Sequence, residues 1–194
     1  LLLVVSSGCA VNCRYCFRRH FPYADNRLSR AQWQQALDYV RRDNSISEII
    51  LSGGDPLMLQ DADLQQLIDH CQAIPHVRRL RIHTRLPVVI PQRLTPALTA
   101  MLAATRLQVS MVLHINHPRE LSDDHRRPLK SLAAAGITLL NQSVLLAQIN
   151  NNISVLSELS ERLFEFGILP YYLHLLDRVK GAHHFDVPES EAIA

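Results

Sequence analysis

Apolar runs that alternate with helix-forming segments recur along the whole chain, and this alternation constrains the fold more than any other feature. Several runs are continuously apolar, which is typical of strands covered on both faces. They lie at residues 1–6, 48–52, 80–84, 107–113, 137–141 and 168–174. Strands that alternate with helices form βα units around a parallel sheet. Right-handed crossovers would curl six such units into a barrel or a doubly wound sheet, and the pattern alone does not separate the two.

Helix start and stop residues fall in the gaps between these runs. Predicted starts are Ser29 with a glutamine three residues on, Asp61, Thr95 followed by Pro96, and Ser122 followed by two acids. We expect the helix after Ser122 to close at Gly136, and a helix from about Ser154 to close at Gly167.

A C-x3-C-x2-C array directly follows the first predicted strand. Cys9, Cys13 and Cys16 can bring three thiolates to one point. A closed structural metal site normally has four protein ligands, whereas a site that does chemistry keeps a position open. An iron-sulfur cluster on these three cysteines would leave one iron free for a small molecule. A zinc site completed by His20, or a disulfide with one spare thiol, is also compatible with the spacing.

Composition narrows the class of protein. A chain of 194 residues with 47% hydrophobic content suffices for one domain with a substantial core. The net charge is only +2 and basic residues form no long run, so neither nucleic acid nor an anionic membrane is implied as a partner. No stretch approaches the roughly 20 apolar residues that span a bilayer. The chain starts without Met on a strand-like run, which predicts a fragment of something longer.

The cysteines also indicate a compartment. Clustered thiols that persist as ligands fit a reducing environment, and we expect the cytoplasm. The fourth cysteine, Cys71, is in helical phase with Leu64, Leu67 and Ile68, which favours a position in the core.

Polar residues follow the predicted strands, at the edge where the active sites of parallel α/β folds gather. The second strand runs into Ser52-Gly53-Gly54-Asp55, where glycines would let a ligand approach the backbone and the aspartate could accept from an ammonium group. An ordinary turn would use the same residues. The other polar ends are His83-Thr84-Arg85, His114-Ile115-Asn116-His117, Asn141-Gln142-Ser143, and His174 with Asp177 beyond. Together they predict a polar cavity that faces the cysteine loop.

These motifs resemble those of radical S-adenosylmethionine (SAM) enzymes, in which a C-x3-C-x2-C array binds a [4Fe-4S] cluster. The resemblance implies that the open iron holds SAM and that electron transfer cleaves SAM to a 5'-deoxyadenosyl radical. It implies an α/β fold with a six-stranded partial (β/α)6 barrel. Ser52, Gly53, Gly54 and Asp55 match the Gly-Gly-Glu motif that holds the methionyl amino group of SAM, with the aspartate in place of glutamate.

Longer runs narrow the resemblance to the lysine 2,3-aminomutases. These runs lie at residues 13–19, 51–57, 85–93, 114–118, 139–146 and 170–174 and span nearly the whole chain. Tyr15, where many free-standing lysine aminomutases have histidine, favours the branch that makes (R)-β-lysine for the modification of elongation factor P (EF-P). The resemblance implies pyridoxal phosphate (PLP) as a second cofactor, an EF-P ligase that receives the product, and a flavodoxin or ferredoxin as electron donor.

The same resemblance assigns roles to individual residues. Arg18 matches the arginine that pairs with the substrate carboxylate, a task that suits a guanidinium fork. Asp177 matches an aspartate that holds the far ammonium group of lysine. Arg85 and Gln142 are expected near SAM or PLP by position only. The lysine that binds PLP belongs to a segment beyond this chain, because the only two lysines here lie outside the family's motif.

Two alternatives remain open on the sequence. One is a radical SAM enzyme that acts on another amino acid such as glutamate, although Asp177 would not favour an acidic side chain. The other is a zinc-stabilised α/β module that binds a partner and has no enzymatic activity.

Overall fold

Six parallel strands form one sheet in the order β1-β2-β3-β4-β5-β6. The computed structural model describes residues 1–18 and 30–193. The strands are β1 (Leu2–Ser6), β2 (Glu48–Gly53), β3 (Arg79–Thr84), β4 (Gln108–His114), β5 (Thr138–Val144) and β6 (Leu169–His174). All six predicted strands and the parallel arrangement are thereby confirmed. Within the described residues β1 and β6 are the two edges, as in the expected partial (β/α)6 barrel.

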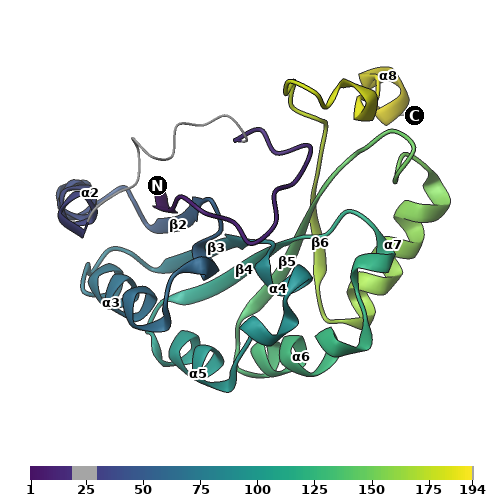
Figure 1. Ribbon diagram of the computed structural model, residues 1–194. Coiled ribbons are helices and arrows are strands. Elements are labelled where there is room, and N and C mark those ends of the chain that lie inside the picture. Colours follow the sequence, from purple (N-terminus) through teal and green to yellow (C-terminus); the bar gives the residue numbers. More distant parts are fainter. Residues whose placement is uncertain (19–29, 194) are drawn as a thin grey trace.

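Helices cover the outer side of the sheet, as Figure 1 shows for α3, α5, α6 and α7. The α-helices are α2 (Arg30–Arg42), α3 (Asp61–Gln72), α4 (Leu86–Val89), α5 (Pro96–Ala104), α6 (Arg126–Ala134), α7 (Ile153–Glu165) and α8 (Glu189–Ile193). Short 3-10 helices are η1 (Pro56–Met58), η2 (Pro91–Arg93), η3 (Pro118–Glu120), η4 (Asp123–His125) and η5 (His183–Phe185). No helix of the described ranges combines the length and the apolar character that a membrane crossing needs.

Side-chain caps explain where several of these helices begin. Thr95 Oγ1 accepts from the Leu98 amide at 3.1 Å, which confirms the predicted start of α5. Ser122 forms a capping box with His125, but the box opens η4, so α6 itself begins only at Arg126. The cap predicted at Ser29 lies outside the described residues.

Glycines end two of the helices as predicted. Gly136 follows α6 with φ +84°, and Gly167 follows α7 with φ +71°. Both lie in the left-handed region, where glycine carries no steric penalty.

A row of apolar side chains runs across five neighbouring strands and forms the centre of the core. In register from β1 to β5 the row consists of Leu3, Leu51, Ile82, Met111 and Leu139. Each of these side chains is buried. Because alternate residues of a strand point to opposite faces, this register places one whole set against the helices and the other set on the inner face.

Cys71 lies in this core, as its helical phase predicted. It is fully buried on α3 together with Leu64, Leu67 and Ile68. Its role is therefore to pack.

The inner face of the sheet, opposite the helices, carries polar side chains. His83 is in register with Val112, and His114 with Gln142. Nearer the amino ends of the strands, Arg81 donates to both carboxylate oxygens of Glu48 at 2.9 and 3.0 Å. The sheet thus separates an apolar outer core from a polar interior.

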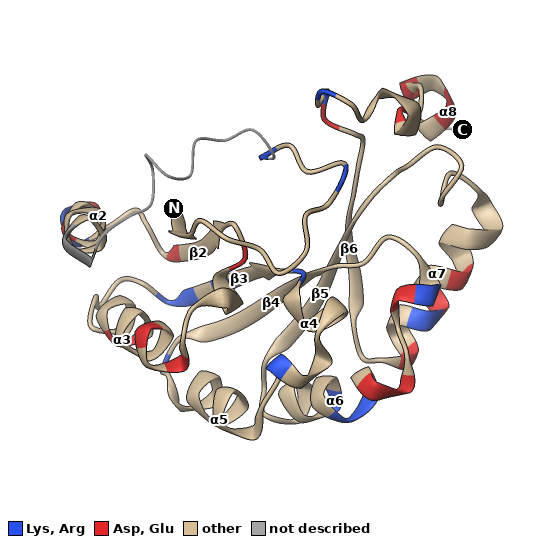
Figure 2. Cartoon of the chain, in the orientation of Figure 1, with Lys and Arg blue, Asp and Glu red and all other residues tan. Residues whose placement is uncertain are grey.

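The charged residues of α6 are all basic, whereas α7 carries charges of both signs (Figure 2). Glu165 lies 3.7 Å from Arg126 and 3.0 Å from Arg162. Between 31 and 52% of the surface of each of these side chains is exposed to solvent, so the pairs add little to stability.

Candidate active site

The cysteine loop leaves β1 and crosses the carboxyl end of the sheet (Figure 1). All three of its thiols are free, with Cys9 exposed and Cys13 and Cys16 half-buried. The protein atoms around Cys9, then the charge of Asp55 and the two neighbouring thiols, raise the pKa of the Cys9 thiol to about 11. Burial also raises the pKa of Cys16, and the nearby Cys13 adds to this effect. The thiols are thus close enough to disfavour one another's ionisation, a cost that bound iron would offset.

Three free thiols in one loop fit the donor set of an iron-sulfur cluster with one open iron. Within residues 1–18 and 30–193, no three Cys, His, Asp or Glu side chains converge closely enough to hold one metal ion. A cluster places a separate iron at each thiolate, so it does not require that convergence. His20, the fourth ligand of the zinc alternative, lies outside the described residues.

The turn after β2 packs directly on the cysteine loop. The Gly54 amide donates to Ser6 O at 2.7 Å, and the Asp55 amide donates to Gly8 O at 2.8 Å. A Cβ at Gly54 would lie 2.3 Å from Gly8 O, and Gly53 has φ +120° with its Cβ position 2.5 Å from Ser6 O. The paired glycines therefore allow two backbones to approach each other, a role that ligand approach alone did not predict.

Asp55 is buried and its carboxylate is fully used by the protein. Oδ1 accepts from the Leu57 amide at 3.0 Å and from Thr84 Oγ1 at 2.6 Å, and Oδ2 accepts from the Arg85 and Leu86 amides at 2.7 and 2.8 Å. Four donors fill the acceptor positions of a carboxylate. Through these contacts Asp55 ties the β2 turn to the end of β3, and its predicted role toward the ammonium group of a ligand stays a prediction.

Arg18 reaches the same turn from the far end of the cysteine loop. Its Nη1 donates to Ser52 Oγ at 2.7 Å and to Gly53 O at 3.0 Å. The structure thus brings together Arg18 and the Ser52–Asp55 segment, which the sequence assigned to different ligands.

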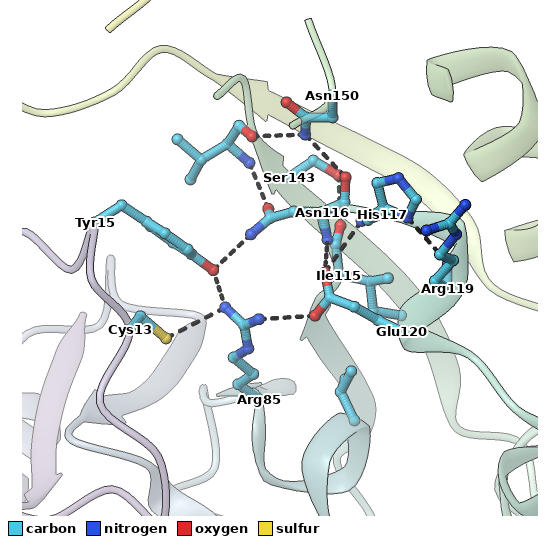
Figure 3. A network of polar contacts seen from close by, with 12 residues as sticks. Cys13, Tyr15, Arg85, Ile115, Asn116, His117, Arg119, Glu120, Ser143 and Asn150 are labelled. Atoms are coloured by element: carbon cyan, nitrogen blue, oxygen red, sulfur yellow. Dashed lines mark hydrogen bonds and ion pairs between the residues drawn. The ribbon is translucent and has the colours of Figure 1, made fainter. Parts of the chain in front are cut away.

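Arg85 is the centre of a polar network that joins the cysteine loop to two strand ends (Figure 3). Nη1 donates to Cys13 Sγ at 3.3 Å and to the Tyr15 hydroxyl, and Nη2 pairs with Glu120 Oε2 at 2.7 Å. Tyr15 also accepts from Asn116 Nδ2 at 2.5 Å. The sequence placed Arg85 near a cofactor, and the structure places it beside a cysteine of the array.

The network continues into the loop after β5. Asn116 Oδ1 accepts from the Val144 amide at 2.8 Å, and Asn150 Nδ2 donates to Asn116 O and Val144 O, each at 2.9 Å. Sequence reasoning missed Glu120 and Asn150. Glu120 carries a usable signal, since it closes a capping box with His117. The sequence around Asn150 carries no such signal, because its partners Asn116 and Val144 are brought close to it only by the fold.

Two histidines on the inner face lie close together, with ring centroids 5.9 Å apart. Nε2 of His83 and of His114 is shielded from solvent and has no hydrogen-bond partner among the described residues. Burial, then the charge of Arg81, lowers the pKa of His83 to about 4, and burial, then His83, lowers that of His114 to about 3. Both rings are therefore neutral near pH 7 and can donate or accept a hydrogen bond without adding charge.

These shifts predict a loss of stability in mild acid. Below about pH 6.5, His83 and His114 are protonated in the unfolded chain but stay neutral in the folded protein. The free energy of unfolding should therefore fall as the pH drops from about 6.5 to the pKa values of the folded state. His114→Gln should flatten this fall, measured by urea unfolding of the cluster-free protein between about pH 7 and pH 5. His183→Gln at an exposed position is the matched control. An unaltered pH dependence in His114→Gln would contradict a buried neutral imidazole.

Other predicted strand-end residues do not face this site. Asn141 and Ser143 are buried and hydrogen-bond to the backbone of Ile115, and His117 caps η3. Only part of the predicted polar cavity is therefore built from these ends, because every second residue of a strand points to the helices. Gln142 lies on the inner face near His83.

Asp177 follows β6 and is solvent-exposed. Nearby, the cysteine loop and the segment after β6 touch where Arg14 Nη2 lies 3.2 Å from His184 Nε2 and the Arg14 guanidinium lies over Phe185. The chain after β6 therefore lies beside the cysteine loop, on the same side of the sheet.

Sequence relatives share nearly all of this chain. L-lysine 2,3-aminomutase of Haemophilus influenzae is 56% identical over 193 residues, which are 100% of this chain and 57% of the relative. L-lysine 2,3-aminomutase of Escherichia coli is 53% identical over 98% of this chain and 56% of its own length. Glutamate 2,3-aminomutase of Clostridioides difficile is 35% identical over 100% and 46%. This chain spans about half the length of these curated relatives.

The fold is also found in a solved structure of native anSMEcpe with bound AdoMet and a peptide. The TM-score is 0.70 at 12% identity, over 98% of this chain and 55% of that one, so this likeness concerns the fold alone. Residues 3–144, which run from β1 to the end of β5, match the family model of the radical SAM superfamily. That match includes the cysteine loop and the glycine turn packed against it, and this chain therefore belongs to the radical SAM superfamily.

Proposed function

We propose that this chain is the catalytic core of a lysine 2,3-aminomutase, an isomerase that moves the α-amino group of L-lysine to the neighbouring carbon. The observation that carries the proposal is the high identity to two L-lysine 2,3-aminomutases along essentially the whole chain. Because the chain spans about half of those relatives, the activity belongs to an enzyme of which residues 1–194 form one radical SAM domain.

Cys9, Cys13 and Cys16 would hold a [4Fe-4S] cluster, and the Ser52–Asp55 turn would hold SAM beside it. When bound, the cluster and SAM together supply a 5'-deoxyadenosyl radical by one-electron transfer. The protein's own contribution is to keep the two binding segments in register, through the backbone contact between Gly8 and Gly54. Asp55 would support SAM binding by fixing the shape of this turn.

Arg18 and Asp177 would recognise the two ends of lysine. One nitrogen of Arg18 holds Ser52 and Gly53, and a guanidinium has further N–H groups for a carboxylate. Asp177 has no hydrogen bond or ion pair within the described part of the chain, so its carboxylate is available to an ammonium group. The two residues lie in the segments that meet beside Arg14 and His184.

The inner face would receive the second cofactor. When bound, PLP supplies a conjugated ring that stabilises the unpaired electron on the substrate. His83, His114 and Gln142 offer neutral hydrogen-bonding groups toward that space, which suits polar ligands that already carry charge. The lysine that binds PLP and the residues that hold its phosphate would come from outside residues 1–194.

Glutamate is the second candidate substrate, because a glutamate 2,3-aminomutase is also a relative. Its side chain ends in a carboxylate, which the carboxylate of Asp177 would repel. The ammonium group of lysine would instead be attracted there, so we favour lysine.

We extend the proposal to β-lysine production for elongation factor P. The support is Tyr15, whose hydroxyl accepts from both Arg85 and Asn116 at the position where many free-standing enzymes have histidine. An EF-P ligase would then receive the product, and a cytoplasmic flavodoxin or ferredoxin would supply electrons. Deletion of the gene should remove β-lysine from EF-P, as measured by intact-protein mass spectrometry.

Asp177→Asn should slow conversion of (S)-α-lysine to β-lysine by the full-length enzyme about thirtyfold or more. Asp177 is exposed in this domain, and in the full-length enzyme the bound lysine would enclose the pair. Loss of one member of an enclosed charged pair costs about 2 to 5 kcal/mol, and about 2 kcal/mol corresponds to thirtyfold. Product formation is measured by chromatography under anaerobic conditions with dithionite and SAM.

Asp186→Asn is the matched control, because Asp186 is also exposed and follows β6. SAM cleavage without lysine should survive in both variants, since the cysteine loop is untouched. An unchanged lysine rate in Asp177→Asn, or a wild type that prefers glutamate, would refute the lysine assignment.

A further inference from the structure

Arg85 lies against the cysteine loop in a geometry that its predicted role does not explain. It leaves the carboxyl end of β3, and Figure 3 shows its guanidinium between Cys13, Tyr15 and Glu120. The donor nearest the array, Nη1, is 3.3 Å from Cys13 Sγ. A fixed cation therefore touches one of the three sulfurs proposed to hold the cluster.

This guanidinium is poorly suited to bind a phosphate or carboxylate from solution. Glu120 already neutralises it at 2.7 Å, and the side chain is only 22% exposed. Its Nε is buried and has no partner within residues 1–18 and 30–193. With both terminal nitrogens engaged, Arg85 has no free fork for the carboxylate of SAM or the phosphate of PLP.

The position of Arg85 is held from behind by the protein. Glu120 Oε1 accepts from the Asn116 and His117 amides at 2.8 and 3.1 Å, which fixes the carboxylate at the start of η3. Tyr15 is anchored in turn by Asn116 Nδ2. Arg85 is thus part of a rigid support that extends from β3 to β4 and contacts the array at one sulfur.

We propose that Arg85 is a positioning residue that donates a charged N–H···S hydrogen bond to the Cys13 thiolate and thereby raises the reduction potential of the cluster. The inference rests on the proposed function, because it presumes a cluster on the three cysteines. Reduction adds one electron, and hence one negative charge, to the cluster, and no bond in the protein forms or breaks. Hydrogen bonds to cluster sulfurs and nearby positive charge stabilise that added charge.

The sign of the effect follows from the distances. Arg85 is charged at every accessible pH, and its Nη1 contacts the sulfur directly. The opposing charge of Glu120 lies on the other terminal nitrogen, farther from Cys13. The nearer charge dominates, so the pair as a whole favours the reduced cluster.

Redox titration of the reconstituted full-length enzyme with dithionite, followed by electron paramagnetic resonance, tests this proposal. Arg85→Met should lower the midpoint potential so that the ratio of reduced to oxidised cluster at a fixed potential falls at least tenfold, which is about 59 mV for one electron. Arg85→Lys keeps the charge but loses the second donor, and we expect a smaller shift in the same direction. Glu120→Gln should shift the potential the opposite way.

Arg93→Met is the matched control. Arg93 is a shielded, ion-paired arginine that contacts Asp61 and the carbonyls of Leu57 and Leu59, and no contact links it to the cysteine loop in the described residues. The midpoint potential of the cluster in Arg93→Met should equal that of the wild type.

A shift in Arg93→Met equal to that in Arg85→Met, or an unchanged potential in Arg85→Met, would overturn the inference while leaving the proposed function intact. If Arg85→Met takes up no cluster, an unchanged potential in Arg85→Lys overturns it. A wild type that assembles no cluster refutes both.

Discussion

Cys13→Ala is expected to abolish cluster assembly and SAM cleavage while the sheet stays folded. Two remaining thiolates cannot satisfy a cluster that needs three, and Cys13 is half-buried in a loop outside the apolar core. After anaerobic reconstitution, the broad absorption near about 400 nm should be missing and bound iron should fall well below four per chain. Circular dichroism should show an unchanged helix and strand content.

Cys71→Ala provides the contrasting control, because this cysteine is fully buried on α3. We expect it to lower the free energy of unfolding by about 1 kcal/mol through the small cavity left behind. Its iron content and SAM cleavage should match the wild type. A Cys13→Ala protein that keeps four irons would rule out the assigned cluster ligands.

Gly54→Ala is expected to disrupt the cysteine loop without touching a cysteine. The added methyl group would lie 2.3 Å from Gly8 O and 2.8 Å from Gly8 C and N, all of them backbone atoms. One of the two loops has to move, at a cost of about 1 to 3 kcal/mol. We expect SAM affinity to fall at least about tenfold, which is about 1.4 kcal/mol, together with a loss of bound iron. Calorimetry and iron analysis measure the two effects.

Gly8→Ala tests the other side of the same contact. A Cβ at Gly8 meets no atom within 4 Å, and its carbonyl still accepts from the Asp55 amide. Iron content and SAM affinity should therefore stay near those of the wild type. Gly54→Ala with unchanged values would mean that the β2 turn is an ordinary turn and does not position the loop.

Much of the fold could be predicted because its signals are local. Helix caps such as Thr95, and glycines such as Gly136, act within a few residues of their own position. The apolar runs located all six strands, but the fifth was predicted too short. The strand continues to Val144 since Asn141 and Ser143, polar in sequence, find partners on the Ile115 backbone. A pattern of apolar residues does not predict hydrogen-bond partners on a neighbouring strand.

The site was predictable only in part, because some of its contacts join residues that lie far apart in the sequence. The spacing of Cys9, Cys13 and Cys16 lies within one loop, so it could be read directly. Asp55 shows the limit, because no local signal indicates the four donors that the fold supplies to its carboxylate, among them Thr84 and the Arg85 amide. Thr84 and Arg85 lie 29 and 30 residues after Asp55, so a pattern of neighbouring residues does not predict these contacts.

Arg85 depends most on the tertiary structure. Its partners Cys13 and Tyr15 lie 72 and 70 positions away, and Tyr15 meets Asn116 across 101 positions. The local sequence predicted which residues follow each strand, because the end of a strand depends on its alternating pattern and on the turn residues after it. Which of these residues contact one another depends on the register of the sheet and on the face to which each side chain points. These are set by packing of the whole core, and a shift of one residue reverses every side chain of a strand.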